Sequence, residues 1–449
     1  MTALIPADRA ALVPAVGRPR PVKLPTVESE VLPNGLRVLA ARRAGVPLIE
    51  ARLVVPTARG EAAPSALVRV MARTLLAGTS ARSAEAIAEV VQGMGGSLDA
   101  LADEEDVVLT GGVLATHAAA LLDLMAEIVL DASHPADEVA LERDRMVQEL
   151  TLARSQPETV AREALARRVF GRHPYGRGLP QPREVSRVRH DALAEARRRW
   201  LGPTGSVLVL VGDLRPERAI REAARAFGAW ADPPGSPAPG MPVPALPKPG
   251  PTVLVDRSGA VQTNVRMAGP GLSRRDPDHP KLAVANLVLG GYFISRLSDN
   301  VRERRGYTYG ISTGVQHRRQ ASTFTLQTDV GTEHTGPALV EIDYELRRML
   351  VGPIEAAELL SAKRYLAGTL AMGIQTQAGL ASYLATLALN DLPISYLRDF
   401  PAAAEAVTTE EVIDVSRRFF APQGLVRVLV GDGGSIGTAV AALGPVVSS

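Results

Sequence analysis

The order of apolar and polar residues predicts a chain that mixes strands and helices. Residues 36–41 and 48–55 alternate with the period of β-strands and are expected to pair as a hairpin, and residues 107–113 form a further strand. Apolar residues at helical spacing predict helices over residues 65–77, 84–94, 115–130 and 136–154. Neighbouring strands follow one another directly as often as a helix separates them. This order favours an α+β fold with mainly antiparallel sheets over a doubly wound parallel sheet.

The chain contains an internal repeat. Residues 198–213 read RRWLGPTGSVLVLVGD and residues 417–432 read RRFFAPQGLVRVLVGD, and the two segments align without a gap at an offset of 219 residues. Each describes the end of a basic helix, a turn and a buried strand. A repeat of this length favours two duplicated domains over a chance likeness between two common elements.

Proline and glycine mark the boundaries of these domains. Residues 232–251 read DPPGSPAPGMPVPALPKPGP, a density of Pro and Gly that neither a helix nor a central strand tolerates. The predicted organisation is therefore a Pro-rich lead-in at 1–27, a first domain at 28–231, a linker at 232–251 and a second domain at 252–449.

Composition narrows the possible functions without choosing one. The 449 residues carry a formal net charge of +2, which gives no sign of a nucleic-acid partner. The chain has no cysteine, so disulfides, Cys-based zinc sites and Cys nucleophiles are excluded. The sequence contains neither an apolar signal segment near its start nor a stretch of about 18 uncharged apolar residues that would span a membrane. The expected location is the cytoplasm.

Four segments of the chain together resemble a known peptidase family. They are 66–79 (ALVRVMARTLLAGT), 82–101 (RSAEAIAEVVQGMGGSLDAL), 140–155 (ALERDRMVQELTLARS) and 288–313 (VLGGYFISRLSDNVRERRGYTYGIST). Their order is similar to that of the insulinase/pitrilysin family, which includes the mitochondrial processing peptidase. The resemblance runs from about residue 30 to residue 432, and it implies a duplicated α+β fold of the kind that this peptidase has.

The zinc motif of the family is missing. Catalytic members carry H-x-x-E-H shortly before a Gly-Thr, where two His on one helix face bind Zn²⁺ and the Glu activates water. Counting back from the Gly-Thr at 78–79, this chain has Arg69, Ala72 and Arg73 instead. The third zinc ligand of the family and its accompanying Glu correspond to Glu149 and Glu142. Because guanidinium groups cannot ligate a metal, the resemblance implies a degenerate site with no metal in this chain.

The remaining polar residues at these positions are expected to satisfy one another. A salt bridge from Glu149 to Arg73 is the specific hypothesis, since a buried carboxylate needs a partner. A different metal site is not expected, because no histidine lies three or four residues from another. The seven histidines are His117, His134, His173, His190, His279, His317 and His334.

A second motif of the family is kept. After a Gly-Gly pair, an aromatic residue and Ser-Arg-Leu, the family has an Arg followed seven residues later by a Tyr, and here these positions are Arg302 and Tyr309. The resemblance implies that the two side chains hold a peptide substrate, with Tyr309 rather than Tyr307 as the functional tyrosine. From the residues alone, Arg302 could instead belong to a solvated run of arginines, and Tyr309 could be a core residue of a strand.

Losing the first motif and keeping the second is typical of one subunit of bacterial two-chain members. The resemblance implies a subunit that is inactive alone and pairs with a homologous subunit that carries H-x-x-E-H and the zinc. Arg302 and Tyr309 would complete the partner's site for peptide hydrolysis. Two alternatives stay open: an inert scaffold or peptide-binding protein of the same fold, and an active single-chain peptidase with a rewired metal site.

Overall fold

A computed structural model describes residues 23–59, 61–232, 239–245 and 248–448. The predicted lead-in at 1–27 lies largely outside this range, and the first strand already begins at Val27. Parts of the predicted linker, 233–238 and 246–247, also lie outside it. None of the helices in the described ranges combines the length and apolar character that a membrane crossing requires.

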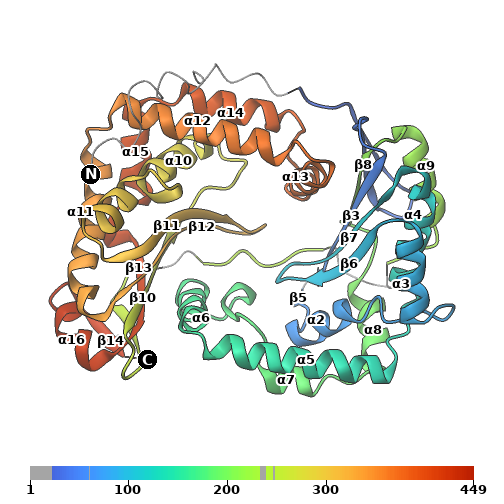
Figure 1. Cartoon of the computed structure of the whole chain (residues 1–449), viewed down its shortest axis with the longest axis horizontal. Helices are drawn as coiled ribbons and strands as arrows, with labels where there is room; N and C mark the ends of the chain where they lie inside the picture. Colours follow the sequence, from blue (N-terminus) through green and yellow to red (C-terminus); the bar gives the residue numbers. More distant parts are fainter. Residues whose placement is uncertain (1–22, 60, 233–238, 246–247, 449) are drawn as a thin grey trace, which may run out of the picture.

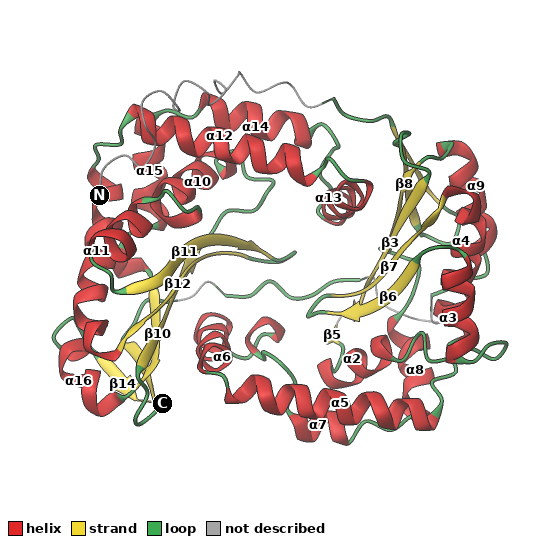
Figure 2. Cartoon of the chain, viewed as in Figure 1, coloured by secondary structure: helices red, strands yellow, loops and turns green. Residues whose placement is uncertain are grey.

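Two six-stranded sheets form the frame of the molecule, and helices pack around them (Figures 1 and 2). The first has the order β1-β2-β8-β3-β7-β6 and the second β11-β12-β10-β13-β9-β14. Most neighbouring strands are antiparallel, and the parallel pairs are β2 with β8, β9 with β13 and β9 with β14. The α+β fold with mainly antiparallel sheets is therefore confirmed.

The strands of the first sheet are β1 (Val27–Val31), β2 (Arg37–Arg42), β3 (Leu48–Pro56), β6 (Ser97–Ala102), β7 (Asp106–Leu114) and β8 (Val207–Gly212). Those of the second are β9 (Thr252–Asp256), β10 (Gln262–Pro270), β11 (Thr308–His317), β12 (Ser322–Gly331), β13 (Val426–Gly431) and β14 (Val446–Ser448). A small separate hairpin is made by β4 (Ala58–Arg59) and β5 (Glu61–Ala62).

The helices of the first half are α2 (Ser65–Arg73), α3 (Ala84–Gly93), α4 (Ala118–Asp131), α5 (Ala136–Ser155), α6 (Pro157–Phe170), α7 (Pro182–Ser186), α8 (Asp191–Trp200) and α9 (Pro216–Phe227). Those of the second are α10 (His279–Asn286), α11 (Thr335–Val351), α12 (Ala356–Gly373), α13 (Gln377–Leu389), α14 (Tyr396–Ala406), α15 (Thr409–Phe419) and α16 (Gly433–Ala441). Two π-helical segments, η3 (Leu287–Gly291) and η4 (Ser298–Arg304), precede β11.

The internal repeat is visible in the sheet order. The repeated segments end in β8 and β13, whose first residues, Val207 and Val426, are the pair that the sequence alignment matches. Each of these strands lies between one antiparallel and one parallel neighbour. The repeated sequence therefore encodes the same interior strand of each half, and the prediction of two duplicated units is confirmed.

The predicted hairpin of the first two alternating segments is wrong. Both segments are strands, β2 and β3, but β8 lies between them and pairs with each. All six residues of β8 are buried, as expected for an interior strand. Alternation marks a strand and its buried face, but it does not specify the neighbour, which here comes from more than 150 residues further along the chain.

Each half places one helix on the sheet of the other half. Helix α13 packs on β3 and β8 of the first sheet, where Leu380 and Leu384 lie in one apolar cluster with Val54 and Val209. Helix α6, in turn, packs on β10 and β13 of the second sheet (Figure 1). The division at 231 and 252 thus separates the two sheets, while each half covers part of the other. The exact domain boundaries at 28–231 and 252–449 stay a prediction.

The tips of two hairpins also join the halves. In the turn between β6 and β7, the Glu105 carboxylate accepts hydrogen bonds from the Tyr175 hydroxyl (2.6 Å) and from the backbone N–H of Arg319 (3.1 Å), in the turn between β11 and β12. The Arg319 guanidinium pairs with Asp106, and Arg318 pairs with Glu104 at 3.2 Å.

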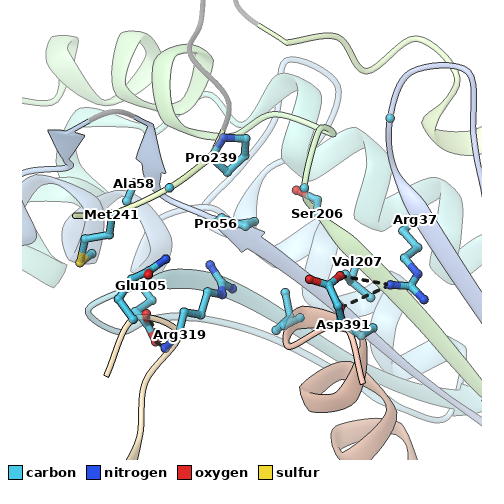
Figure 3. Close-up of a pocket in the computed structure, with 16 residues that line it drawn as sticks. Arg37, Pro56, Ala58, Glu105, Ser206, Val207, Pro239, Met241, Arg319 and Asp391 are labelled. Atoms are coloured by element: carbon cyan, nitrogen blue, oxygen red, sulfur yellow. Dashed lines mark hydrogen bonds and ion pairs between the residues drawn. The ribbon is translucent and has the colours of Figure 1, made fainter. Parts of the chain in front are cut away.

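A cavity of about 300 Å³ lies beside this contact. Figure 3 shows Glu105 and Arg319 on one side of it and Arg37 with Asp391 on the other. The Nη1 atom of Arg37 lies 3.9 Å from the Asp391 carboxylate and 3.4 Å from the carbonyl oxygen of Ala388. Both ends of the cavity are therefore lined by charged groups that already have partners across the junction.

Candidate functional site

The degenerate zinc positions lie on two helices that pack together, α2 and α5. Arg73, in the last turn of α2, binds Glu149 of α5 with both ends of its guanidinium, at 3.2 Å from Nη1 to Oε1 and 2.5 Å from Nη2 to Oε2. The carboxylate of Glu142 lies 3.9 Å from the same guanidinium. The predicted salt bridge is thus present, and the two carboxylates corresponding to the family's ligand pair both face an arginine.

The environment of this salt bridge differs from the expectation in one respect. The Glu149 side chain is 57% exposed, so it is not the buried carboxylate that the hypothesis assumed. Its hydrogen bond from Arg73 lowers the pKa of Glu149 below the usual value. An ion pair in this setting is partly screened by water, and its contribution to stability is correspondingly small.

The other two positions hold no metal-binding group either. The Arg69 side chain donates to the Ser65 hydroxyl (3.2 Å) and to the carbonyl oxygen of Ala102 at the end of β6 (3.1 Å). Burial lowers the pKa of Arg69, but an arginine stays protonated in proteins and offers no lone pair. Ala72 is fully buried in the core of the first half.

Zinc therefore does not fit this site. A tetrahedral site needs about three or four N, S or O ligands, whereas here the carboxylates of Glu149 and Glu142 are held by a positive charge. Across the described ranges, no three His, Cys, Asp or Glu side chains come together in a way that could hold a metal ion.

Arg302 and Tyr309 come together in the second half. Arg302 lies in η4, and Tyr309 is the second residue of β11, the edge strand of the second sheet. The centre of the Arg302 guanidinium lies 5.4 Å from the centroid of the Tyr309 ring and 4.5 Å from that of Phe293. Two aromatic rings thus hold the guanidinium by cation–π contacts.

The neighbouring charges leave Arg302 available. Arg304 pairs with Asp299 at 2.6 Å and Arg305 pairs with Glu341 at 2.7 Å. For Arg302 the nearest carboxylate among the described residues is that of Glu303, whose Oε1 is 3.5 Å from Nε. The run of arginines is therefore not uniform, because its first member rests on aromatic rings and not in a strong ion pair.

Exposure distinguishes the two tyrosines of this segment. Tyr309 is 93% exposed, which contradicts a core role for it. Tyr307 packs against the second core and stacks on His334, with 5.1 Å between the ring centroids. Phe293 and Ile294 are also mostly exposed, and Phe293 is the one of the two that contacts the Arg302 guanidinium among the described interactions.

The Gly-Gly and Ser-Arg-Leu residues that precede Arg302 have structural roles. A Cβ on Gly290 would lie 2.8 Å from Thr313 of β11, so glycine lets η3 pack closely against that strand. Arg296 is buried and binds Glu358 of α12 in a bidentate pair at 2.7 and 2.9 Å. These contacts fix the segment that carries Arg302 to the sheet on one side and to a helix on the other.

Comparison with known proteins identifies the class first. The model of the insulinase family of peptidases (M16) matches residues 69–183, and the model described as the peptidase M16 inactive domain matches residues 187–366. The first match begins at Arg69, where the zinc motif would stand. The second contains Arg302 and Tyr309.

Relatives agree with this class over most of the chain. An uncharacterized zinc protease of Mycobacterium leprae is 26% identical over 85% of this chain and 86% of its own length. One of Mycobacterium tuberculosis is 25% identical over 86% of this chain and 89% of its own. A probable mitochondrial-processing peptidase subunit beta of Arabidopsis thaliana is 23% identical over 60% of this chain and 51% of its own.

Solved structures share the whole architecture. The crystal structure of a peptidase M16 inactive domain from Pseudomonas fluorescens has a TM-score of 0.83 and 25% identity, and the match covers 91% of this chain and 98% of that one. A protease from Helicobacter pylori has the same TM-score at 16% identity, a likeness of fold alone. The chain belongs to the insulinase (M16) family of peptidases and has a fold like that of the mitochondrial processing peptidase.

Proposed function

We propose that this chain is the subunit of a two-chain zinc peptidase that binds no zinc itself and contributes Arg302 and Tyr309 to its partner's active site. The partner is a homologous subunit carrying H-x-x-E-H, and the cytoplasm is the expected compartment. The observation that carries the proposal is the contrast between two sites. An ion pair from Arg73 occupies the zinc positions. Arg302 and Tyr309, in contrast, are in contact with each other, with Tyr309 exposed and Arg302 partly buried, and the ion pair described for Arg302 is a 3.5 Å contact with Glu303.

The roles of the two side chains follow from their chemistry. The planar guanidinium of Arg302 presents several N–H donors, which can bind the carbonyl oxygen of an extended peptide. The Tyr309 hydroxyl can donate to the same carbonyl or to the oxyanion that forms when water attacks it. The cation–π contacts with Phe293 and Tyr309 orient the guanidinium before substrate arrives, so little of its rotamer entropy remains to be lost on binding.

The edge strands suggest how a peptide would be held. Among the strands that the structure describes, β6 and β11 each have a neighbour on one side only, which leaves main-chain groups of the other side available to an added strand. Tyr309 lies on β11 itself, so a peptide along this edge would pass the proposed contact residues. Main-chain pairing is weakly selective for sequence, which fits a peptidase acting on unfolded peptides.

The alternative is a scaffold or peptide-binding protein of the same fold that takes part in no cleavage. The ion pair between Arg73 and Glu149 is compatible with the scaffold alternative, because it leaves no catalytic group at the zinc positions of the first half. The two functions differ in what they require of Tyr309, since only the peptidase needs its hydroxyl group during turnover.

The test is to co-express the chain with a homologous H-x-x-E-H subunit and to assay peptide cleavage by each chain alone and by both together. Activity is expected only from the pair. Tyr309→Phe should then lower kcat by about a hundredfold or more, because one oxyanion donor is typically worth about 2.7–4 kcal/mol. The control is Tyr344→Phe, an exposed tyrosine on α11 outside the motif, which should leave kcat unchanged.

Three results would reject the proposal. A change of less than threefold for Tyr309→Phe in an active pair would leave the hydroxyl no catalytic role and favour the scaffold. If no H-x-x-E-H homologue forms an active complex with this chain, the scaffold is again favoured. Stoichiometric zinc in the purified chain, together with peptide cleavage by that chain alone, would show that the metal-free assignment is wrong.

A further inference from the structure

A second cavity, of about 600 Å³, lies among helices of the second half. Residues of α10, β11, α12, α13 and α14 line it, and none of them belongs to the degenerate zinc site or to the Arg302 and Tyr309 pair. Its volume is within the range of about 300–1,000 Å³ that is typical of small-molecule sites. The proposed peptidase function leaves this cavity unused.

A chain of hydrogen bonds follows one wall of the cavity. The Ser322 hydroxyl lies 3.0 Å from Nδ1 of His317, whose Nε2 lies 3.3 Å from Nε2 of His279, and Nδ1 of His279 lies 3.0 Å from the Tyr396 hydroxyl. Burial lowers the pKa of His279 to about 4 and that of His317 to about 3, and the charge of Arg274 adds to both effects. Each neutral imidazole has one donor and one acceptor, so these groups satisfy one another.

The charge on the wall is not balanced. Arg274 is the one charged residue of the lining, and no described carboxylate forms a salt bridge with it. Its Nε is buried and has no hydrogen-bond partner within the described part of the chain. The Arg274 side chain is partly buried and lies beside the Tyr396 hydroxyl, but its charge has no described counter-ion. An anion from outside could bind the unpartnered N–H and offset this charge.

Asn286 supplies a second unmet group. It lines the cavity, is 8% exposed, and its Oδ1 has no hydrogen-bond partner among the described residues. An unpartnered buried acceptor is unfavourable, and a ligand with an N–H or O–H donor would satisfy it. The cavity is therefore complementary to a ligand that carries both a negative charge and a hydrogen-bond donor.

The rest of the wall is largely apolar. It is formed by the side chains of Val315, Leu366, Leu370, Leu387 and Phe400, with the hydroxyl groups of Thr369, Ser382 and Thr386 between them. The positive charge argues against a metal cation, although the two His Nε2 atoms face each other. An apolar body with one carboxylate fits the lining better than a highly charged phosphate compound, which would need more than one cation.

We propose that this cavity binds a small apolar carboxylate that also carries a hydrogen-bond donor, with the carboxylate on Arg274 and the donor on Asn286. An N-acylated apolar amino acid has this chemistry, and so does the last residue of a peptide with a free C-terminus. The inference does not depend on the proposed peptidase function, and it is tested on the chain by itself.

The probes are N-acetylphenylalanine and a hexapeptide that ends in phenylalanine, each compared with its C-terminal amide by calorimetric titration. Each acid that binds should do so at least tenfold more tightly than its amide, because only the acid can pair with Arg274. Binding of the small acid alone identifies a free small molecule as the source, and binding of the peptide acid identifies a peptide C-terminus. If neither acid binds at millimolar concentration, or if acid and amide bind equally, the proposal is overturned.

Arg274→Gln should weaken binding of the acid at least tenfold. The matched control is Arg275→Gln, which removes the adjacent guanidinium that already pairs with Asp391 at 2.7 Å, and it should leave binding unchanged. Equal loss in both variants, or no loss in Arg274→Gln, refutes the assignment of Arg274.

A measurement on the parent protein keeps the proposal testable if the variant does not fold. The imidazole NMR signals of His279 and His317 should shift when the acid is added, because both rings line the cavity and a bound carboxylate changes their surroundings. The amide should leave these signals in place. Signals that ignore both compounds would contradict a ligand in this cavity.

Discussion

His134 should make the first half sensitive to acid. The side chain is 1% exposed and lies beside the end of α2, where its Nδ1 is 2.8 Å from the Thr74 hydroxyl. That hydroxyl already donates to the carbonyl oxygen of Val70, so it accepts from Nδ1–H. Nε2 is then a buried acceptor without a partner among the described residues, and protonating it would place a charge in the core.

The sign and size of the effect follow from the pKa. Burial, with a further contribution from the charge of Arg197, lowers the pKa of His134 from 6.5 to about 4. The unfolded chain therefore binds the proton more readily, and the free energy of unfolding falls as the pH drops below 6.5. Between pH 7 and pH 5 this single group should lower it by about 2 kcal/mol, and by about 3 kcal/mol once the pH is below 4.

The comparison variant is His134→Asn. The residue has a φ of 50°, a conformation that asparagine tolerates, and the asparagine amide can still donate to Thr74. Both tryptophans of the chain, Trp200 and Trp230, are buried in the core of the first half, so their fluorescence reports unfolding of this half. Urea titrations of parent and variant at pH 7, 6 and 5 then isolate the contribution of His134, because all other groups titrate in both proteins.

The variant should lose about 2 kcal/mol less than the parent between pH 7 and pH 5. Parallel loss in the two proteins would refute the reasoning. So would an NMR titration that gives His134 a pKa near 6.5 in the folded protein, since the imidazole would then be solvated and not buried beside Arg197.

Three further predictions concern packing and contacts. A double-mutant cycle with Arg73→Met and Glu149→Gln can be measured by urea denaturation. The coupling energy should be about 0.2–1 kcal/mol, because the pair is partly exposed. A value near zero would contradict an ion pair that contributes to stability in solution. Leu384→Ala should lower the free energy of unfolding by about 2–5 kcal/mol, because Leu384 is buried between α13 and the first sheet. The control, Leu360→Ala at an exposed position of α12, should lower it by less than about 0.5 kcal/mol. Equal effects would show that α13 does not pack on the first sheet. Tyr175→Phe removes the hydroxyl that joins the two hairpin tips and should lower the free energy of unfolding by about 1–3 kcal/mol. In calorimetry, the difference between the melting temperatures of the two halves should increase. An unchanged calorimetric profile would contradict this contact.

The sequence by itself determined the positions of helices and strands and the absence of the family's zinc ligands. Helices α3 and α5 and strand β7 lie within about a residue of their predicted ranges, because apolar spacing and proline positions act over a few residues. The absence of zinc ligands at Arg69 and Arg73 is a matter of side-chain type and needed no coordinates. The repeat also revealed the duplicated fold before the sheets were known.

The candidate site was predictable in part. Seven-residue spacing selected Arg302 and Tyr309, but it gave no sign that Phe293 completes the contact with the guanidinium. Exposure of Tyr309 and packing of Tyr307 were equally invisible, since both occur in the same short polar segment. The cavity of Arg274 was missed because its lining comes from several separate elements, among which His279 and His317 are 38 residues apart.

The tertiary structure alone decided the neighbours. β8 lies between β2 and β3, α6 and α13 pack on the sheet of the opposite half, and Glu105 meets Tyr175 and Arg319 at the junction. Each of these contacts joins residues that are distant in the sequence. A residue's own pattern records whether it is buried and on which face, but the identity of the surface that buries it depends on how the whole chain packs.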